Sequence, residues 1–564
     1  MLLAVLGAVL VKVGLLQTFE GAALRSAAAQ QWTRERILLA QRGAIFDRNG
    51  DELALSVPAR TIAVNPKQVE DPATTARYFQ AVLGLDSERT AELEAEMAAR
   101  DRGFLYVARQ VDVDVAEQLD ELELAGVTVY REDRRTFPGG VTARSVIGNT
   151  NIDAKGIAGL ERQYDKVLRG TNGSLSLEVA PDGRSVPGTE EQLDAPIPGN
   201  DLVLTIDRSV QYAVEQALLR RVSETRARGG QAIVIESKTG GVIAMASVRI
   251  NDDGVYEVTS GNFSAVDAYE PGSVGKVITL AGALNENKVE PDTHFTVPWQ
   301  KVYTRAGDRL SDSHIHGDEW LSVEDILVES SNIGTITVSE QMGFERQYHY
   351  MRDFGLGQKT ALDFPGESTG ILEPWQQWEG LEKYTVAFGQ GVASTPIQLA
   401  AAVNVIANDG VYVAPRLVSG MLDGDGVLQA ADEADTRRVV DEETAQQMQR
   451  MMREVVCRGT AEAAQVPGLS VAGKTGTGYI AQEDGGYLLP DGTKAYYASF
   501  VGFMPAEDPQ ATVLVSIDQP DKTTDARFGG IAAAPVFRDL APTIVHELGI
   551  DPPLGSTGCE SEEE

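Results

Sequence analysis

The sequence predicts a multidomain α+β protein in which one antiparallel sheet packs against helices. The chain has 564 residues, too many for one ordinary hydrophobic core, so two or more domains are expected. A Pro- and Gly-rich stretch, VPGTEEQLDAPIPGN, marks a boundary near residue 200. Beyond it, strand patterns come first and last and helical patterns dominate between them, which is typical of a sheet flanked by helices.

The amino-terminal 19 residues are mostly apolar and are interrupted by Lys12 and Gln17. A transmembrane helix needs about 20 apolar residues, whereas a signal-peptide core needs about 7–15. We interpret residues 1–19 as a single membrane anchor. A buried amphipathic helix is the alternative, and the true first residue is left open.

Residues 20–200 are expected to form a first folded domain. A polar helix is predicted up to about Arg42, and RGAIFDRNGDELALS then has an Asn-Gly turn between two strands, a hairpin pattern. Residues 73–125 are rich in Ala, Glu and Leu and are predicted to be helical.

Residues 201–550 are expected to form the larger domain, and 551–564 an acidic disordered tail. DLVLTID is a predicted strand, and Asp207 is a candidate cap for a helix that follows it. That helix should bury one face, formed by Val210, Val214, Leu218 and Val222.

Composition and the rare side chains exclude several functions. The formal charge of −34 and the pI near 4.6 disfavour nucleic acid and anionic lipid headgroups. Cys457 lies in a helical pattern and Cys559 in the acidic tail, so no structural disulfide is expected and the redox compartment stays open. His314 and His316 are two residues apart, a spacing that allows two histidines to bind one zinc ion. No third ligand is evident nearby, so we favour an ordinary pair of histidines on a strand or loop and predict no metal.

The triplet Lys-Thr-Gly occurs twice. In QAIVIESKTGGVIAMAS it lies between two apolar runs, so Lys238 to Gly240 should be the turn of a β-hairpin with Lys238 in water. The second copy, Lys474 to Gly476, opens a strand and is followed by Thr477 and Gly478. Glycines beside a lysine allow another backbone to approach a strand edge closely, so the second copy is the candidate binding element.

Two further elements carry candidate catalytic groups. In YEPGSVGKVITL, Ser273 and Lys276 are three residues apart and share one face of a helix. A serine hydroxyl needs a base to become nucleophilic, and a lysine can serve if burial or nearby cations lower its pKa. In SVEDILVESSNIGT, Ser322 and Asp325 resemble a capped helix start, and Ser330 and Asn332 should follow that helix on a loop. Taken alone, each element is better explained by a structural role: a serine cap followed by a lysine with its charge in water, and a polar helix end.

Together, Ser-x-x-Lys, Ser-x-Asn and Lys-Thr-Gly in this order form the signature of serine β-lactamases and penicillin-binding proteins. The chain resembles a class B penicillin-binding protein, a monofunctional peptidoglycan D,D-transpeptidase of the division type. The resemblance covers nearly the whole chain. RGAIFDRNG, RTFPGG, GLERQYDKVLRG and LTID resemble the family's pedestal (dimerisation) domain and its junction, and EPGSVGK, SSNIG, AFGQGVASTPIQLAAA, AGKTGTG and GGIAAAPVFRDLAP resemble its β-lactamase-like transpeptidase domain.

The resemblance implies a mechanism and a location. Ser273 would be the nucleophile and Lys276 its base, Ser330 would relay a proton, and Asn332 would position the peptide. Lys474, Thr475, Gly476 and Thr477 would bind the substrate's terminal carboxylate. It also implies that the ligands are stem peptides ending in D-Ala-D-Ala and β-lactams, and that no cofactor is needed. The implied partners are a membrane glycan polymerase and division proteins. The implied location is the cell membrane, with a single-pass anchor and the catalytic domain outside the cytoplasm.

Three other interpretations fit less well. A β-lactamase is about half as long and needs a deacylating Glu-x-x-Leu-Asn element, which is not found between Ser330 and Lys474. A bifunctional synthase would have acidic glycosyltransferase motifs within residues 20–200, and these are not found. A scaffold without activity would not be expected to keep all three motifs. One departure from the family is Gly478, where many members carry alanine; it leaves the shape of this strand edge open.

Overall fold

The computed structural model describes residues 5–7, 9, 12–13, 32–178, 180, 186, 188–189, 191–424, 426–480, 486–489, 492–521, 524–551 and 558–559. Most of the predicted anchor at 1–19 lies outside these residues. Within the described part of the chain, no helix combines the length and the apolar character needed to cross a bilayer.

The chain folds into two compact units that are interleaved along the sequence. Unit 1 comprises Met1–Ala44, Leu55–Thr136 and Lys166–Asp201, and unit 2 comprises Ile45–Ala54, Phe137–Asp165 and Leu202–Glu564. Two short early segments join unit 2 because hydrogen bonds hold them there: Arg208 N donates to Asp47 Oδ2 at 3.1 Å, and Ala143 N donates to Glu215 Oε1 at 2.8 Å. The bounds 20–200 and 201–550 stay a prediction.

Unit 1 is built on antiparallel strands. β1 (Thr33–Leu38) pairs with β6 (Gly173–Glu178), which also pairs with β7 (Glu191–Asp194). The polar helix predicted up to Arg42 is therefore wrong over residues 33–38, because pairing along the whole length of β6 overrides the local helical pattern.

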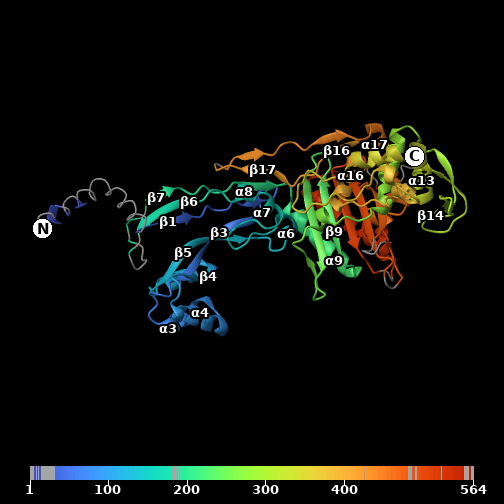
Figure 1. Cartoon of the computed structure of the whole chain (residues 1–564). Helices are drawn as coiled ribbons and strands as arrows, with labels where there is room; N and C mark the ends of the chain where they lie inside the picture. Colours follow the sequence, from blue (N-terminus) through green and yellow to red (C-terminus); the bar gives the residue numbers. More distant parts are fainter. Residues whose placement is uncertain are drawn as a thin grey trace. The chain divides into compact units, whose positions relative to one another are not determined.

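The predicted helical stretch at 73–125 contains a strand as well as helices. The helices are α3 (Pro72–Leu83), α4 (Ser87–Ala99) and α5 (Val113–Asp120), and β4 (Leu105–Val111) lies between the second and the third. β3 (Glu52–Val64) pairs with β4 and with β5 (Val127–Thr136) (Figure 1). The side chains of Phe79, Leu93 and Met97, from α3 and α4, are buried in the core with residues of these strands. β3 also pairs with β2 (Ile45–Phe46), which confirms the predicted hairpin.

Unit 2 contains a six-stranded sheet in the order β11-β10-β9-β22-β21-β20, with every neighbouring pair antiparallel. β9 (Gly229–Glu236), β10 (Val242–Ile250) and β11 (Tyr256–Val258) come early in the unit. β20 (Ala472–Tyr479), β21 (Tyr496–Met504) and β22 (Ala511–Asp518) come late. The early and late strands meet where β9 pairs with β22, and β20 lies at one edge.

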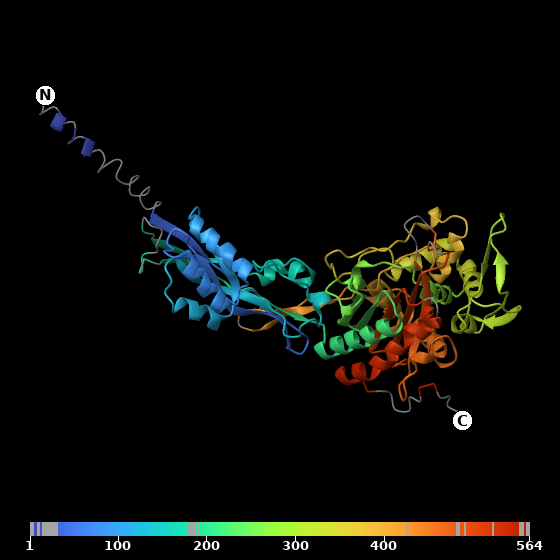
Figure 2. The ribbon, with the colours of Figure 1, turned by 90° about the horizontal axis from the view of Figure 1, so that it is seen from below.

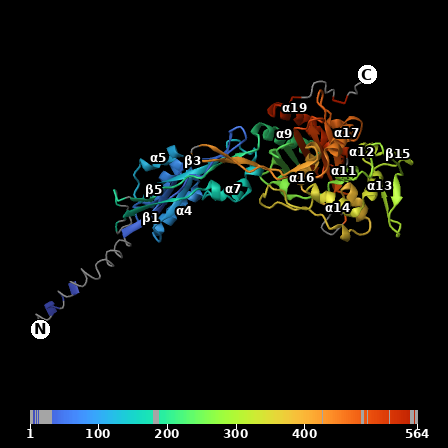
Figure 3. The same cartoon turned by 90° about the horizontal axis from the view of Figure 1, so that it is seen from above.

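Helices cover both faces of this sheet. α9 (Arg208–Glu224) and α19 (Ala534–Glu547) lie side by side on one face (Figure 2). α9 packs closely on β9, because a Cβ added to Gly230 of that strand would touch Leu218 and Val222 of the helix. α16 (Pro396–Ala407) lies on the other face (Figure 3) and accepts a hydrogen bond from Thr512 Oγ1 at Asn404 Oδ1, 2.7 Å away. Asp207 caps α9 as predicted, through Ser209 N and Val210 N, and the predicted apolar face is buried.

The first Lys-Thr-Gly is the turn between β9 and β10, as predicted. Gly240 has φ +69°, a value that favours glycine because it lacks Cβ. Lys238 is 44% exposed and its Nζ pairs with Asp409 Oδ2 at 2.8 Å. This copy is a structural turn.

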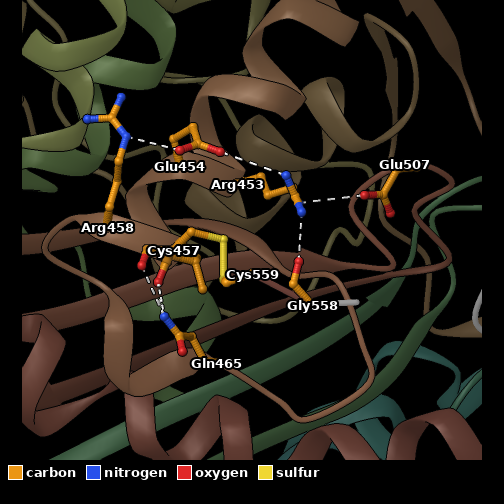
Figure 4. Close-up of a disulfide and its surroundings, with 9 residues drawn as sticks. Arg453, Glu454, Cys457, Arg458, Gln465, Glu507, Gly558 and Cys559 are labelled. Carbon is orange, nitrogen blue, oxygen red and sulfur yellow. Dashed lines mark hydrogen bonds and ion pairs between the residues drawn. A yellow bond between two sulfur atoms is a disulfide. The ribbon is translucent and has the colours of Figure 1, made fainter. Parts of the chain in front are cut away.

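The expectation that the two cysteines do not pair is wrong. Cys457 and Cys559 form a disulfide with a Cα–Cα distance of 5.1 Å (Figure 4). Cys457 lies in α17 (Glu442–Arg458), and one turn earlier Arg453 donates a hydrogen bond to Gly558 O at 2.7 Å. Sequence composition marks this end of the chain as a polar tail, but the bond and this contact fix residues 558–559 against the helix.

Candidate active site

The candidate nucleophile and base lie at the start of one buried helix. Ser273 is in a 3₁₀ turn, η1 (Gly272–Gly275), and Lys276 begins α11 (Lys276–Asn285). Gly272 has φ +54°, and its backbone N–H donates to Gly389 O at 3.0 Å, which fixes the turn. Within the described residues, no group hydrogen-bonds to the Ser273 hydroxyl, and this residue is half-buried while the rest of the turn is buried.

The second candidate element is a turn between two helices. Ser322 and Asp325 form the predicted capping box at the start of α12 (Val323–Val328), and α13 (Asn332–Met342) follows. Ser330 has φ +62° between the helices. Asn332 is the first residue of α13 rather than a loop residue, because the preceding Ser331 caps this helix by accepting from Gly334 N at 2.9 Å.

The third element is the edge strand β20, which contains the second Lys-Thr-Gly. Lys474 is fully buried in it, and Gly476 is buried as well. The hydroxyl of Thr475 lies 2.7 Å from that of Thr460, so this side chain already has a partner within the protein. Thr477 is half-buried.

The three elements meet at Ser330. Lys276 Nζ lies 3.1 Å from Ser330 Oγ and also donates to the Ser330 carbonyl, and Lys474 Nζ lies 2.9 Å from the same Oγ. Ser273 is one turn ahead of Lys276. The Asn332 amide instead donates to Ser311 O at 3.0 Å. Segments 54 and 144 residues away from Ser330 thus converge on one hydroxyl.

Burial makes both lysines unusually acidic. Both are fully buried, and an ammonium loses its hydration there. Burial lowers the pKa of Lys474 to about 7. The pKa of Lys276 falls well below its usual 10.5, first because of burial and then because of the charge of Lys474, although Asp312 opposes the shift. A lysine in this state can accept a proton near neutral pH.

Glycines allow the backbone of β20 to pack closely against the segment that carries Ser273. A Cβ on Gly476 would lie 2.8 Å from Pro271 O, and a Cβ on Gly478 would lie 2.0 Å from Glu270 O. A Cβ on Gly272 would in turn lie 2.5 Å from Thr477 O. These glycines set the distance between the edge strand and the nucleophile.

Comparison with known proteins identifies the family to which the chain belongs. A family model for the penicillin-binding protein transpeptidase domain matches residues 230–541, and one for the penicillin-binding protein dimerisation domain matches residues 37–204. The chain belongs to the class B penicillin-binding proteins. The predicted resemblance, the two-domain α+β fold and the enzyme class, a serine-type D,D-transpeptidase, are confirmed.

Individual relatives match this penicillin-binding protein over nearly its whole length. It is 33% identical to penicillin-binding protein PbpB of Mycolicibacterium smegmatis, covering 98% of this chain and 90% of the relative. It is 33% identical to stage V sporulation protein D of Bacillus subtilis, covering 96% and 83%. The structure of penicillin-binding protein 3 of Mycobacterium tuberculosis complexed with aztreonam aligns with a TM-score of 0.69 at 29% identity, covering 92% and 99%.

Replacing Gly478 with alanine is expected to disturb this penicillin-binding protein. The added methyl would meet the Glu270 carbonyl, so β20 or the nucleophile turn must move. Overpacking of this kind costs about 1–3 kcal/mol, which would lower the melting temperature and slow acylation by a β-lactam.

A matched control is Gly424→Ala, because a Cβ on Gly424 meets nothing within 4 Å and its φ is not positive. Calorimetry and acylation rates of both variants check the prediction. Equal, near-zero effects would show that the strand edge moves freely.

Sequence reasoning missed Asp312 of this penicillin-binding protein. The stretch SDSHIHGDEW drew attention only for its histidines, yet the Asp312 side chain is 4% exposed and contacts the turn between α12 and α13. An acidic residue beside a histidine pair is the signal that could have identified it. The described residues contain no group of three or more His, Cys, Asp or Glu suited to a metal ion.

Proposed function

We propose that the convergence of Lys276 and Lys474 on Ser330 activates Ser273 as the nucleophile of peptidoglycan cross-linking. Ser273 Oγ bonds to the carbonyl carbon between the two terminal D-alanines of a stem peptide, and Lys276 accepts the hydroxyl proton. The amide C–N bond then breaks, and Ser330 relays the proton to the amine of the departing D-alanine. An amine from a neighbouring stem next attacks the ester, forms the new amide and restores the Ser273 hydroxyl.

The remaining groups are proposed to bind the substrate. Lys474, with Thr475, Gly476 and Thr477, recognises the terminal carboxylate, and Asn332 positions the peptide. The backbone N–H groups of Ser273 and Thr477 stabilise the oxyanion, a contribution often worth about 3–4 kcal/mol. The short approach between Gly272 and Thr477 O supports this arrangement, because it brings the backbones of the two segments together.

The observation that carries the proposal is the pair of fully buried lysines sharing one hydroxyl. A base for Ser273 must be largely neutral at the working pH, and burial together with the charge of Lys474 lowers the pKa of Lys276 in that direction. Two charged ammonium groups this close would repel, so one proton shared between them through Ser330 is favoured.

The location and partners are also proposals. We place the catalytic domain outside the cytoplasm, behind an anchor at residues 1–19, and we assign the protein to cell division with a membrane glycan polymerase and division proteins as partners. The disulfide between Cys457 and Cys559 supports an oxidising compartment. The division role is supported by the resemblance near GGIAAAPVF.

Labelled penicillin tests the nucleophile. A β-lactam mimics the terminal dipeptide and leaves slowly, so mass spectrometry of the full chain is expected to find one adduct on the peptide containing Ser273. The adduct should disappear in Ser273→Ala. An adduct that survives in this variant would refute the assignment.

A further inference from the structure

Asp312 lies where it can hold the turn that carries Ser330. Its Oδ1 accepts from the backbone N–H groups of Asn332 and Ile333, the latter at 2.9 Å, and its Oδ2 accepts from Ser331 Oγ at 2.8 Å. The first two donors of α13 have no carbonyl partner within the helix, so this carboxylate satisfies them from a different segment. The position of Ser330 opposite the two lysines therefore depends on Asp312.

His316 contacts the same carboxylate and is itself enclosed by acceptors. Its Nε2 lies 3.2 Å from Asp312 Oδ2, and its Nδ1 lies 2.7 Å from Gly317 O and 3.3 Å from Glu319 Oε2. The side chain is only 7% exposed. A neutral imidazole has one N–H and would leave one nitrogen facing an acceptor without a proton, whereas the imidazolium donates on both sides.

We propose that Asp312 and His316 form a carboxylate–imidazolium pair that positions the Ser330 turn and makes acylation of Ser273 depend on the protonation of His316. Both are positioning residues, and the inference rests on the proposed nucleophile. When His316 loses its proton, one of its hydrogen bonds is lost and the charge of Asp312 is no longer balanced. The turn is then held less firmly, and the unbalanced carboxylate favours the protonated form of Lys276, which is inactive as a base.

The surrounding charges agree with this direction. Glu319 on β15 (Glu319–Ser322) contacts His316, Glu329 after α12 interacts with its charge, and His314 lies beside it. Asp312 also interacts electrostatically with Lys276. Burial disfavours the charged ring, but the Gly317 carbonyl and the carboxylates of Asp312 and Glu319 outweigh it, so the pKa of His316 is raised above its usual 6.5. The charge on His316 is present below this raised pKa and is lost as the pH rises through it.

The test compares acylation rates of wild type and His316→Gln from about pH 5.5 to about pH 9 with a fluorescent penicillin. Glutamine can donate one hydrogen bond to Asp312 but carries no charge, so it resembles neutral histidine. The ratio of the two rates is expected to be about tenfold on the acid side, the usual size for a hydrogen bond to a charged group, and to approach one on the alkaline side. Lys276 titrates in both proteins, so the ratio reports only the difference that the charge on His316 makes.

Two controls separate positioning from general electrostatics. His314→Gln removes the neighbouring ring, whose centroid is 5.3 Å away, and its ratio should stay near one at every pH. In the Asp312→Asn background, His316→Gln should change the rate by less than about twofold at every pH, since coupled residues are not additive. A flat ratio in wild type, or a ratio that survives Asp312→Asn, would overturn the inference.

A second measurement does not depend on activity. The chain has five histidines, so imidazole NMR can follow His316 directly. Its pKa should fall in Asp312→Asn, and an unchanged titration would refute the pair. If wild type is acylated at Ser273 but the ratio is flat, only the pair fails; if wild type is not acylated there, the proposed function fails and the inference with it.

Discussion

Alanine at Lys474 is expected to slow acylation of Ser273 by about 10²- to 10³-fold. Removing one partner of a buried charged pair typically costs about 2–5 kcal/mol, and each 1.4 kcal/mol is about tenfold. Lys474 is fully buried, lies 2.9 Å from Ser330 Oγ and is the proposed site for the substrate carboxylate. Its loss removes that charge and also one of the two effects, burial and the charge of Lys474, that lower the pKa of Lys276.

The same triplet elsewhere in the chain provides the matched control. Lys238→Ala changes a Lys-Thr-Gly lysine that is 44% exposed and pairs with Asp409 on the surface. Exposed ion pairs contribute about 0–1 kcal/mol, and the turn is part of no described catalytic contact, so acylation should stay within about twofold. Stopped-flow rates with a chromogenic cephalosporin measure both variants. Similar losses in the two would mean that the assignment of the triplets is wrong.

Removing the disulfide by Cys457→Ser with Cys559→Ser is expected to destabilise unit 2 by about 4–5 kcal/mol. The bond closes a loop whose ends are 102 residues apart, and a cross-link of this span restricts the unfolded chain strongly. The acylation rate at low temperature should change little, because neither sulfur contacts Ser273, Lys276 or Ser330. Calorimetry measures the loss as a lower melting temperature of the catalytic unit.

Reductant gives an independent check on the disulfide. It should lower the melting temperature of wild type towards that of the double variant and leave the double variant unchanged. A wild-type transition that reductant does not move would show that the bond is absent in solution or contributes nothing to stability.

Local patterns in the sequence predicted many elements correctly. The cap at Asp207, the capping box at Ser322 and the turn at Gly240 each depend on residues within a few positions of one another, so the sequence contains the whole interaction. The spacing of Ser273 and Lys276 is local for the same reason. The order of the three motifs then indicated the family, which the comparisons confirm.

Long-range pairing explains the errors. Residues 33–38 have a helical pattern but form a strand, because β6 provides a partner more than a hundred residues away. Cys559 lies in an acidic end that has no packing pattern of its own, and only the proximity of α17 allows its bond to Cys457. Neither partner can be recognised from the residues that surround these segments in the sequence.

For the candidate site, the sequence by itself determined which side chains are available: a serine and a lysine on one turn, a second serine, and a lysine among glycines. The tertiary structure decided that Ser330 is the hydroxyl both lysines share, that burial lowers their pKa values, that Asp312 binds the turn, and that His316 contacts Asp312. The reason is physical. Hydrogen bonds and desolvation depend on distances between segments that only the packed fold brings together.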